Sequence, residues 1–355
     1  MFDSAPIGPI ERRWIEGLGR AEREIALLER VQPRNALPER ARLRESWLAG
    51  RPIAPDFRYA PAPALQTVFE LLAGIAHGGV ESLIGELCVD RALELEREAR
   101  LVEAVGTPDF PRLARLRFAP AADDVAQAEA WAESWLGLAP VTPRETRHLS
   151  DDASDHQSLL AVLSRQIGSG RLPIRVDVRD NLSTTAATGE GVICVRRGVW
   201  LYAREAERIA LHELEAHALP RIAAAAQGGL LTVGTAGASD DEEGRAIWLE
   251  QRAGYLDDRR KAELGRRHVA AQAVRSGASF VETVELLLAK ATPLDAAIDL
   301  GCRVFRGGGL GREVVYLTAF SKVTRAFEQT PELEPMLARG RVGVDAARRM
   351  LVSPR

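Results

Sequence analysis

The stretch IALHELEAHALP, at residues 209–220, decides how the second half of this chain folds. It places two histidines, His212 and His217, on either side of the acidic residue Glu213. Histidines four residues apart on a helix face the same direction and can share a metal ion. Five residues apart, they differ in direction by about 140° on a regular α-helix. We therefore expect either no metal site or a local π-helical turn with i→i+5 pairing, and Pro220 favours such a departure from regular geometry.

The residues before this motif predict a small sheet, and those after it predict further helices. Residues 172–180 and 191–198 alternate apolar and polar side chains, which is typical of short strands, and a Ser/Thr-rich turn separates them. The motif itself lies in an expected helix at about 204–219. Other expected helices lie within 10–48 and at 64–76, 91–105, 123–136, 241–256, 260–273, 280–289, 293–305 and 313–327.

These patterns predict an α+β protein that is mostly helical, with a small β-sheet beside the motif helix. We expect residues 1–150 to form a helical N-terminal region. Residues 151–355 would form the catalytic region, and the two would pack as one unit.

The composition is that of an ordinary globular protein: of 355 residues, 46% are hydrophobic and 27% are charged. The net charge of −3 argues against nucleic acid or an anionic membrane as a partner. The three cysteines form no C-x-x-C pair, which argues against a thiolate zinc site. No apolar run is long enough to cross a bilayer, and the N-terminus lacks the features of a signal peptide, so a cytoplasmic location is expected. The oligomeric state is left open.

A third metal ligand is expected from SDDEEGRAIWLE, at residues 239–250. A catalytic zinc ion takes three protein ligands, commonly histidine nitrogens and a carboxylate oxygen, and leaves one position to water. From chemistry alone, Glu242 and Glu243 are equally suitable. The remaining histidines, which are His77, His148, His156 and His268, have no partner at ligand spacing, and we interpret them as surface or core residues.

Four segments together resemble the tubulin tyrosine carboxypeptidase family. They are HELEAH (212–217), EEGRAIWLE (242–250), SGASFVET (276–283) and CRVFRGGGLGREVVYL (302–317). Their order and approximate spacing are similar to those of that family, which includes the eukaryotic microtubule-associated tyrosine carboxypeptidases and bacterial relatives known by a QEGLA motif. The resemblance covers about residues 172–327. The predominance of arginine over lysine favours the bacterial branch.

The resemblance implies a zinc site with His212, His217 and Glu243 as ligands and with Glu213 as the general base. It also shows departures. Glu242 stands where the family has glutamine, and Arg245 stands where it has leucine.

In a later motif, Arg312 and Glu313 replace the family's lysine and aspartate, while Tyr316 is kept. We expect Arg306 and Arg312 to bind the carboxylate of the substrate, because a guanidinium grips a carboxylate with two hydrogen bonds. Arg303 is a further candidate. Tyr316 would donate to the developing oxyanion. Each of these residues could instead have an ion-paired or core role.

Glu250 is a candidate for orienting one of the histidines. The predicted function is hydrolysis of the C-terminal peptide bond of a peptide or protein, with release of an aromatic residue. The alternatives are another zinc-dependent amide hydrolase, an endopeptidase, or a catalytically silent relative that binds peptide ends.

Overall fold

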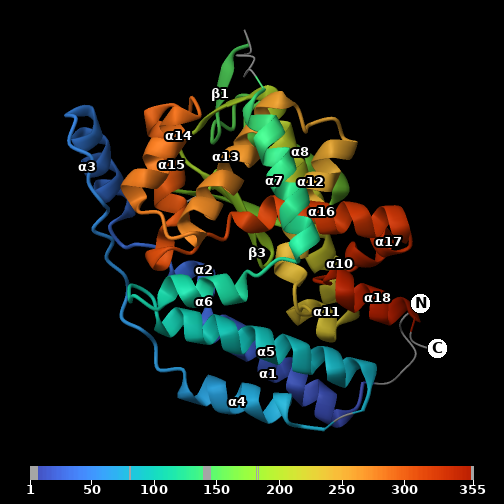
Figure 1. Ribbon diagram of the computed structural model, residues 1–355. Helices are drawn as coiled ribbons and strands as arrows, with labels where there is room; N and C mark the ends of the chain where they lie inside the picture. Colours follow the sequence, from blue (N-terminus) through green and yellow to red (C-terminus); the bar gives the residue numbers. More distant parts are fainter. Residues whose placement is uncertain (1–6, 80, 139–144, 181, 183, 353–355) are drawn as a thin grey trace. The chain divides into compact units, whose positions relative to one another are not determined.

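The computed structural model of this chain describes residues 7–79, 81–138, 145–180, 182 and 184–352. Contacts divide the chain into two compact units. The first contains Met1–Gly137, Lys261–Thr318 and Ser353–Arg355, and the second contains Leu138–Arg260 and Ala319–Val352. Both are mostly helical, and the strands belong to the second (Figure 1), which confirms the predicted fold class. The regional boundary expected at residue 150 stays a prediction.

Helices are the only regular elements among the described residues of the first unit. Its helices α1 and α4 both pack against α5 (Figure 1), and α14 packs against α15. Helix α14 begins at a capping box, in which the Ser279 hydroxyl accepts from the Glu282 amide and the Glu282 carboxylate accepts from the Ser279 amide. The elements are α1 (Pro9–Ile25), α2 (Leu27–Arg30), α3 (Ala36–Leu48), α4 (Gln66–Ala76), α5 (Leu83–Glu103), α6 (Phe110–Arg117), α7 (Ala122–Leu136), most of α13 (Asp258–Arg275), α14 (Phe280–Ala289), α15 (Leu294–Val304), the 3-10 helix η2 (Arg306–Gly308) and the start of α16 (Val314–Gln329).

The second unit begins with strands and continues with helices. Its elements are β1 (Arg147–Leu149), α8 (Leu159–Gly170), β2 (Arg175–Arg179), β3 (Ala186–Gly189), β4 (Val192–Arg196), β5 (Trp200–Tyr202), α9 (Ala203–Leu211), the π-helix η1 (His212–Ala218), α10 (Leu219–Gln227), α11 (Leu230–Val233), α12 (Ala238–Arg252), the remainder of α16, α17 (Leu333–Leu337) and α18 (Val344–Val352). No helix in the described part of the chain has the length and apolar character that a membrane crossing requires.

The three-stranded sheet has the order β2-β4-β3, with β2 parallel and β3 antiparallel to β4. The two predicted strands correspond to β2 and β4. The segment between them, predicted as a turn, contains a third strand, β3, so that prediction was wrong. The sequence of β3 is Ala-Ala-Thr-Gly, which has no large apolar residue to mark a strand. Strands β1 and β5 form a separate antiparallel pair.

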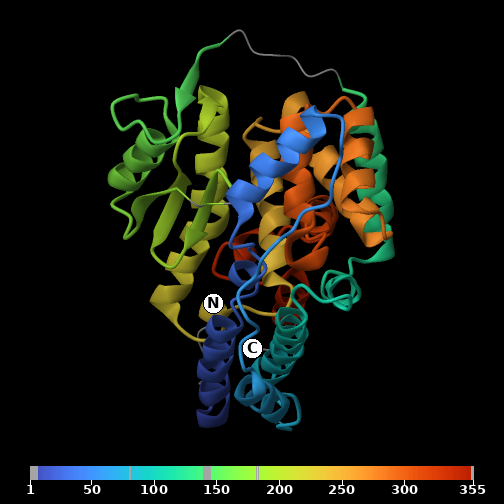
Figure 2. The same cartoon turned by 90° about the vertical axis from the view of Figure 1, so that its left-hand side faces the viewer.

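The sheet and the motif helix share one hydrophobic core. Ile193 and Val195 of β4 are fully buried and pack in the same cluster as Ala210 of α9 and Leu214 of η1. Figure 2 shows the green strands beside the yellow-green helix that contains this motif. The core therefore holds one side of the motif helix against the sheet, as predicted. The opposite side of this helix does not pack on the sheet.

Candidate metal centre

The turn that begins at His212 is a π-helix, which confirms the predicted departure from α-helical geometry. The Leu219 amide donates to the Leu214 carbonyl, five residues earlier, instead of to the residue four earlier. This wider turn brings the two histidines together: the ring centroids of His212 and His217 lie 5.1 Å apart. Single π-helical turns are rare and concentrate at functional sites.

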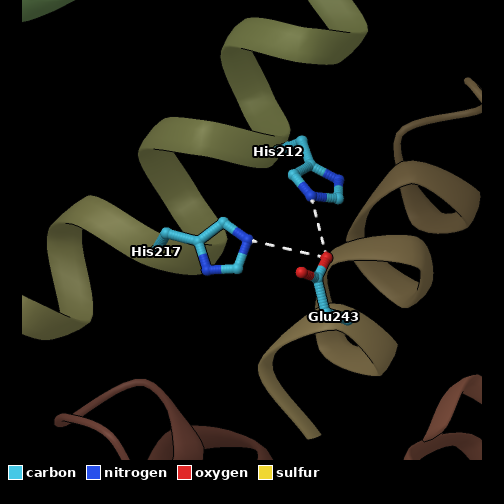
Figure 3. Close-up of side chains that lie close together, drawn as sticks. All are labelled: His212, His217 and Glu243. Atoms are coloured by element: carbon cyan, nitrogen blue, oxygen red, sulfur yellow. Dashed lines mark ion pairs between the residues drawn. The ribbon is translucent and has the colours of Figure 1, made fainter. Parts of the chain in front are cut away.

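Three side chains converge at this turn (Figure 3). Oε2 of Glu243 lies 3.5 Å from Nε2 of His212 and 4.0 Å from Nε2 of His217. One ligand atom from each residue lies within 4.8 Å of the other two, so this group could hold a metal ion. Glu243 comes from α12, which packs against η1. Two imidazole nitrogens and one carboxylate oxygen form a donor set that suits zinc.

The far nitrogen of His212 is held by a buried acid. Nδ1 of His212 donates to Oε1 of Glu250 at 2.8 Å, and Glu250 is completely buried. Arg260 donates to both oxygens of this carboxylate at 2.8 and 3.0 Å, and Arg208 donates at 3.2 Å. Burial alone would raise the pKa of Glu250, but the two guanidiniums hold it well below its usual range. The predicted orienting role of Glu250 toward a histidine therefore agrees with its position.

A second acid lies behind His217. Nδ1 of His217 lies 3.4 Å from Oε2 of Glu242, and Nη2 of Arg221 lies 3.6 Å from the same oxygen. Burial would raise the pKa of Glu242, but His217 and the nearby arginines lower it. The two neighbouring acids therefore occupy different positions: Glu243 faces both Nε2 atoms, whereas Glu242 faces the opposite nitrogen of one ring.

The carboxylates of Glu242, Glu243 and Glu250 favour positive charge at the candidate site. Burial disfavours the charged form of His212, but its hydrogen bonds with Glu243 and Glu250 outweigh burial and raise the pKa of His212 to about 10. A site that stabilises an extra proton this strongly would also stabilise a divalent cation. The cation would replace the proton, because it binds the lone pair of a neutral imidazole. The charge and the donor types of the group both fit zinc.

Glu213 is buried and is held by the edge strand β3. The Thr188 hydroxyl lies 2.8 Å from Oε2 of Glu213 and 3.1 Å from its backbone carbonyl. Nη1 of Arg221 donates to the backbone carbonyl of Thr188 at 3.1 Å. Strand β3, which the sequence did not reveal, therefore positions the predicted base.

The glycine after Glu243 allows α12 to approach α16 closely. A Cβ atom added at Gly244 would lie 2.3 Å from the backbone of Ala319. No side chain fits at that distance. The glycine in the E-G motif therefore allows the helix that carries Glu243 to pack directly against the backbone of α16.

The predicted substrate residues belong to the first unit, and their proposed roles stay predictions. Arg306 and Arg312 are buried, and both interact with the buried acid Glu313. Burial lowers the pKa of Arg306 to about 10. The Tyr316 hydroxyl accepts from Nη2 of Arg303 at 2.9 Å, and Arg303 donates to Glu313 as well. Arg306 thus already has an acidic partner within its unit.

Sequence reasoning missed four residues that hold the acids around the candidate metal site. Thr188, Arg208, Arg221 and Arg260 lie in four different elements or connections, and none has a motif of its own. Only their contacts with Glu213, Glu242 and Glu250 reveal them. Arg208 and Arg221 each lie four residues from a histidine on the same helical segment. This spacing does not identify them, because the acids that they contact lie on a different helix.

Comparison with known proteins supports the resemblance found in the motifs. The profile of the microtubule-associated tyrosine carboxypeptidase family matches residues 49–351. No curated protein and no solved structure gives a significant match. The match extends the resemblance from the second half of the chain to most of its length. The chain therefore belongs to the microtubule-associated tyrosine carboxypeptidase family and is a hydrolase of the carboxypeptidase class.

Proposed function

We propose that this chain is a zinc-dependent carboxypeptidase that removes the last residue of a peptide or protein. The observation that supports this most strongly is the convergence of Nε2 of His212, Nε2 of His217 and Oε2 of Glu243, in a chain of this family. Zinc, when bound, would supply Lewis acidity for the scissile carbonyl and the attacking water.

The protein's own groups would perform the remaining steps. Glu250 and Glu242 would fix the ring orientations of His212 and His217. Glu213 would take a proton from the attacking water and deliver it to the leaving amine. The hydroxyl of Thr188 would hold the Glu213 carboxylate in place during both transfers.

Metal analysis tests the first part of the proposal. We expect about one zinc ion per chain, lost when His212 and His217 are both replaced by alanine. Glu213→Gln should keep the zinc and lose peptidase activity, because the amide cannot accept the proton. Unchanged metal content in the double variant, or full turnover in Glu213→Gln, would contradict the proposed roles.

Peptide substrates test the second part. Peptides that end in tyrosine, phenylalanine or alanine, each with a free or an amidated C-terminus, are incubated with the protein and the products are identified by mass spectrometry. We expect cleavage only of peptides with a free C-terminus. Cleavage should be fastest when the C-terminal residue that is released is aromatic. Equal cleavage of free and amidated peptides would indicate an endopeptidase or another amide hydrolase. Binding of peptides by the zinc-loaded protein without any hydrolysis would indicate a silent relative.

Finer assignments extend this proposal. Arg306 and Arg312 would bind the terminal carboxylate, and Tyr316 would stabilise the oxyanion, if their buried contacts rearrange around substrate. We also place the chain in the bacterial QEGLA branch and in the cytoplasm, on the composition and motif arguments given above. The aromatic preference rests on the family to which the chain belongs.

A further inference from the structure

The π-helical turn that joins the two histidines lacks hydrogen-bond donors at its end. Under α-helical pairing, the Glu215 carbonyl would accept from the Leu219 amide, but that amide donates to Leu214. Under π-helical pairing it would accept from residue 220, which is a proline and has no N–H. The Ala216 carbonyl loses its α-helical donor for the same reason. Pro220 therefore leaves the Glu215 carbonyl without a backbone donor in either kind of pairing, and the Ala216 carbonyl without its α-helical donor.

A single guanidinium supplies that partner. Nη1 of Arg245 donates to the Glu215 carbonyl at 3.0 Å and to the Ala216 carbonyl at 3.3 Å. Nη1 carries two hydrogens, so it can serve both oxygens at once. Arg245 is buried, and burial lowers its pKa despite the nearby carboxylates of Glu242 and Glu215. Among the described residues, no carboxylate is in direct contact with this buried arginine. Its guanidinium therefore serves to pair these backbone carbonyls.

The position of Arg245 links this contact to the metal centre. It lies on α12, two residues after Glu243, and its partners lie between His212 and His217 on η1. One helix thus provides Glu243, the third metal-binding residue of the candidate site (Figure 3). The same helix carries the guanidinium that donates to the turn between the two histidines.

We propose that Arg245 is a positioning residue, which holds the π-helical turn open so that His212 and His217 can bind one ion. The inference rests on the proposed zinc site. Without these two hydrogen bonds, the Glu215 carbonyl has no donor in either kind of helical pairing, and the Ala216 carbonyl, on a buried residue, has lost its α-helical donor. The turn would then relax toward a geometry in which the imidazoles diverge.

Zinc affinity tests this role directly. The zinc dissociation constant of the full-length protein is measured by competition with a chromogenic chelator. We expect Arg245→Met to bind zinc about tenfold or more weakly, as for other residues that orient ligands. Arg245→Lys should keep most of the affinity, because an ammonium can donate to both carbonyls. Arg252→Met, which removes an exposed arginine from the same helix, should leave the constant unchanged.

A second experiment tests the link with Pro220 without zinc. Pro220→Ala restores a backbone N–H that can serve the same carbonyls, so Arg245→Met should lower the unfolding midpoint of the metal-free protein less in that background than in the wild type. Equal losses in both backgrounds would overturn the inference, as would wild-type zinc affinity in Arg245→Met. If the wild-type protein itself binds no zinc, the proposed function fails, and the coupling measured without metal still decides the role of Arg245.

Discussion

Two histidines with little exposure to solvent have opposite electrostatic surroundings in this chain. In the second unit, His212 lies between Glu243 and Glu250, which raise its pKa to about 10. In the first unit, His268 is 1% exposed, and neither of its ring nitrogens has a hydrogen-bond partner among the described residues. Burial lowers the pKa of His268 to about 4.

The difference shows that burial alone does not determine what a histidine does. Both rings are removed from water, which penalises the charged form of each. Only at His212 are carboxylates placed so that a cation is stabilised, and only there do a second histidine and a third donor lie nearby. His268 is a core residue, in agreement with its interpretation from the sequence. Between these two histidines, the carboxylates around the ring separate the candidate ligand from the packing residue, whereas burial does not.

The largest effect is expected from removing the carboxylate behind His212. Glu250→Ala leaves Arg208 and Arg260 buried without their acid, and we expect it to lower the free energy of unfolding by about 3–5 kcal/mol. It should also weaken zinc binding by about 10–100-fold. Denaturant unfolding of the metal-free protein and a zinc competition assay measure the two effects. Glu250→Gln, which keeps an acceptor for His212, should lose less of both, and equal losses in the two variants would contradict the orienting role.

The next largest effect concerns His268 and pH. Because its folded pKa is about 4 and its unfolded value is about 6.5, the unfolded chain binds a proton first as the pH falls. Its contribution to stability is therefore present above pH 6.5 and is lost between about pH 6.5 and pH 4, by about 3 kcal/mol in total.

His268→Leu should remove this loss, so the difference in unfolding free energy between the variant and the wild type should grow in favour of the variant as the pH falls from 7 to 4. Denaturant titrations at several pH values check this. A difference that does not change with pH would mean that the buried ring is not the origin of the effect.

A change at Gly244 tests how closely Glu243 must approach His212. Gly244→Ala forces a methyl group against the backbone of Ala319, and we expect it to lower the free energy of unfolding by about 2 kcal/mol. As α12 shifts, Glu243 should move from His212, and the variant should bind zinc more weakly. Ala246→Gly, on the same helix, is the matched control: it weakens the helix without adding a clash, so its zinc affinity should remain closer to that of the wild type.

The smallest effect is expected at Thr188, which contacts Glu213, the proposed base, and none of the three proposed ligand atoms. Thr188→Val should lower kcat about tenfold, equivalent to about 1.4 kcal/mol, and should leave KM and zinc affinity nearly unchanged. Thr188→Ser keeps the hydroxyl and should retain most of the rate. Thr184→Val, whose hydroxyl contacts only the Ala186 carbonyl in this region, is the control. A loss of zinc in Thr188→Val would indicate a general distortion instead.

Local rules predicted the π-helical turn as one of two alternatives and identified the acids near it, but they did not fix the positions of those acids. The five-residue spacing of His212 and His217 allowed a shared site only with a π-helix, and Pro220 disfavoured regular pairing. The acidic run before Gly244 suggested the third metal ligand. Residue chemistry left Glu242 and Glu243 as alternatives, and the family resemblance favoured Glu243, which the structure places beside both Nε2 atoms. Strand β3 was missed because small residues carry no periodic signal. The partners of the acids were missed because an arginine many residues away gives no local pattern.

The arrangement of β3 has a consequence for how copies of this protein behave together. As an outer strand of its sheet, β3 would normally offer free backbone groups to another chain, but the Thr188 carbonyl is already occupied by Arg221. The opposite outer strand, β2, carries Arg175, Asp177 and Arg179 along its length. Charged side chains along one outer strand and an occupied backbone carbonyl on the other are both features that disfavour edge-to-edge pairing with a second copy.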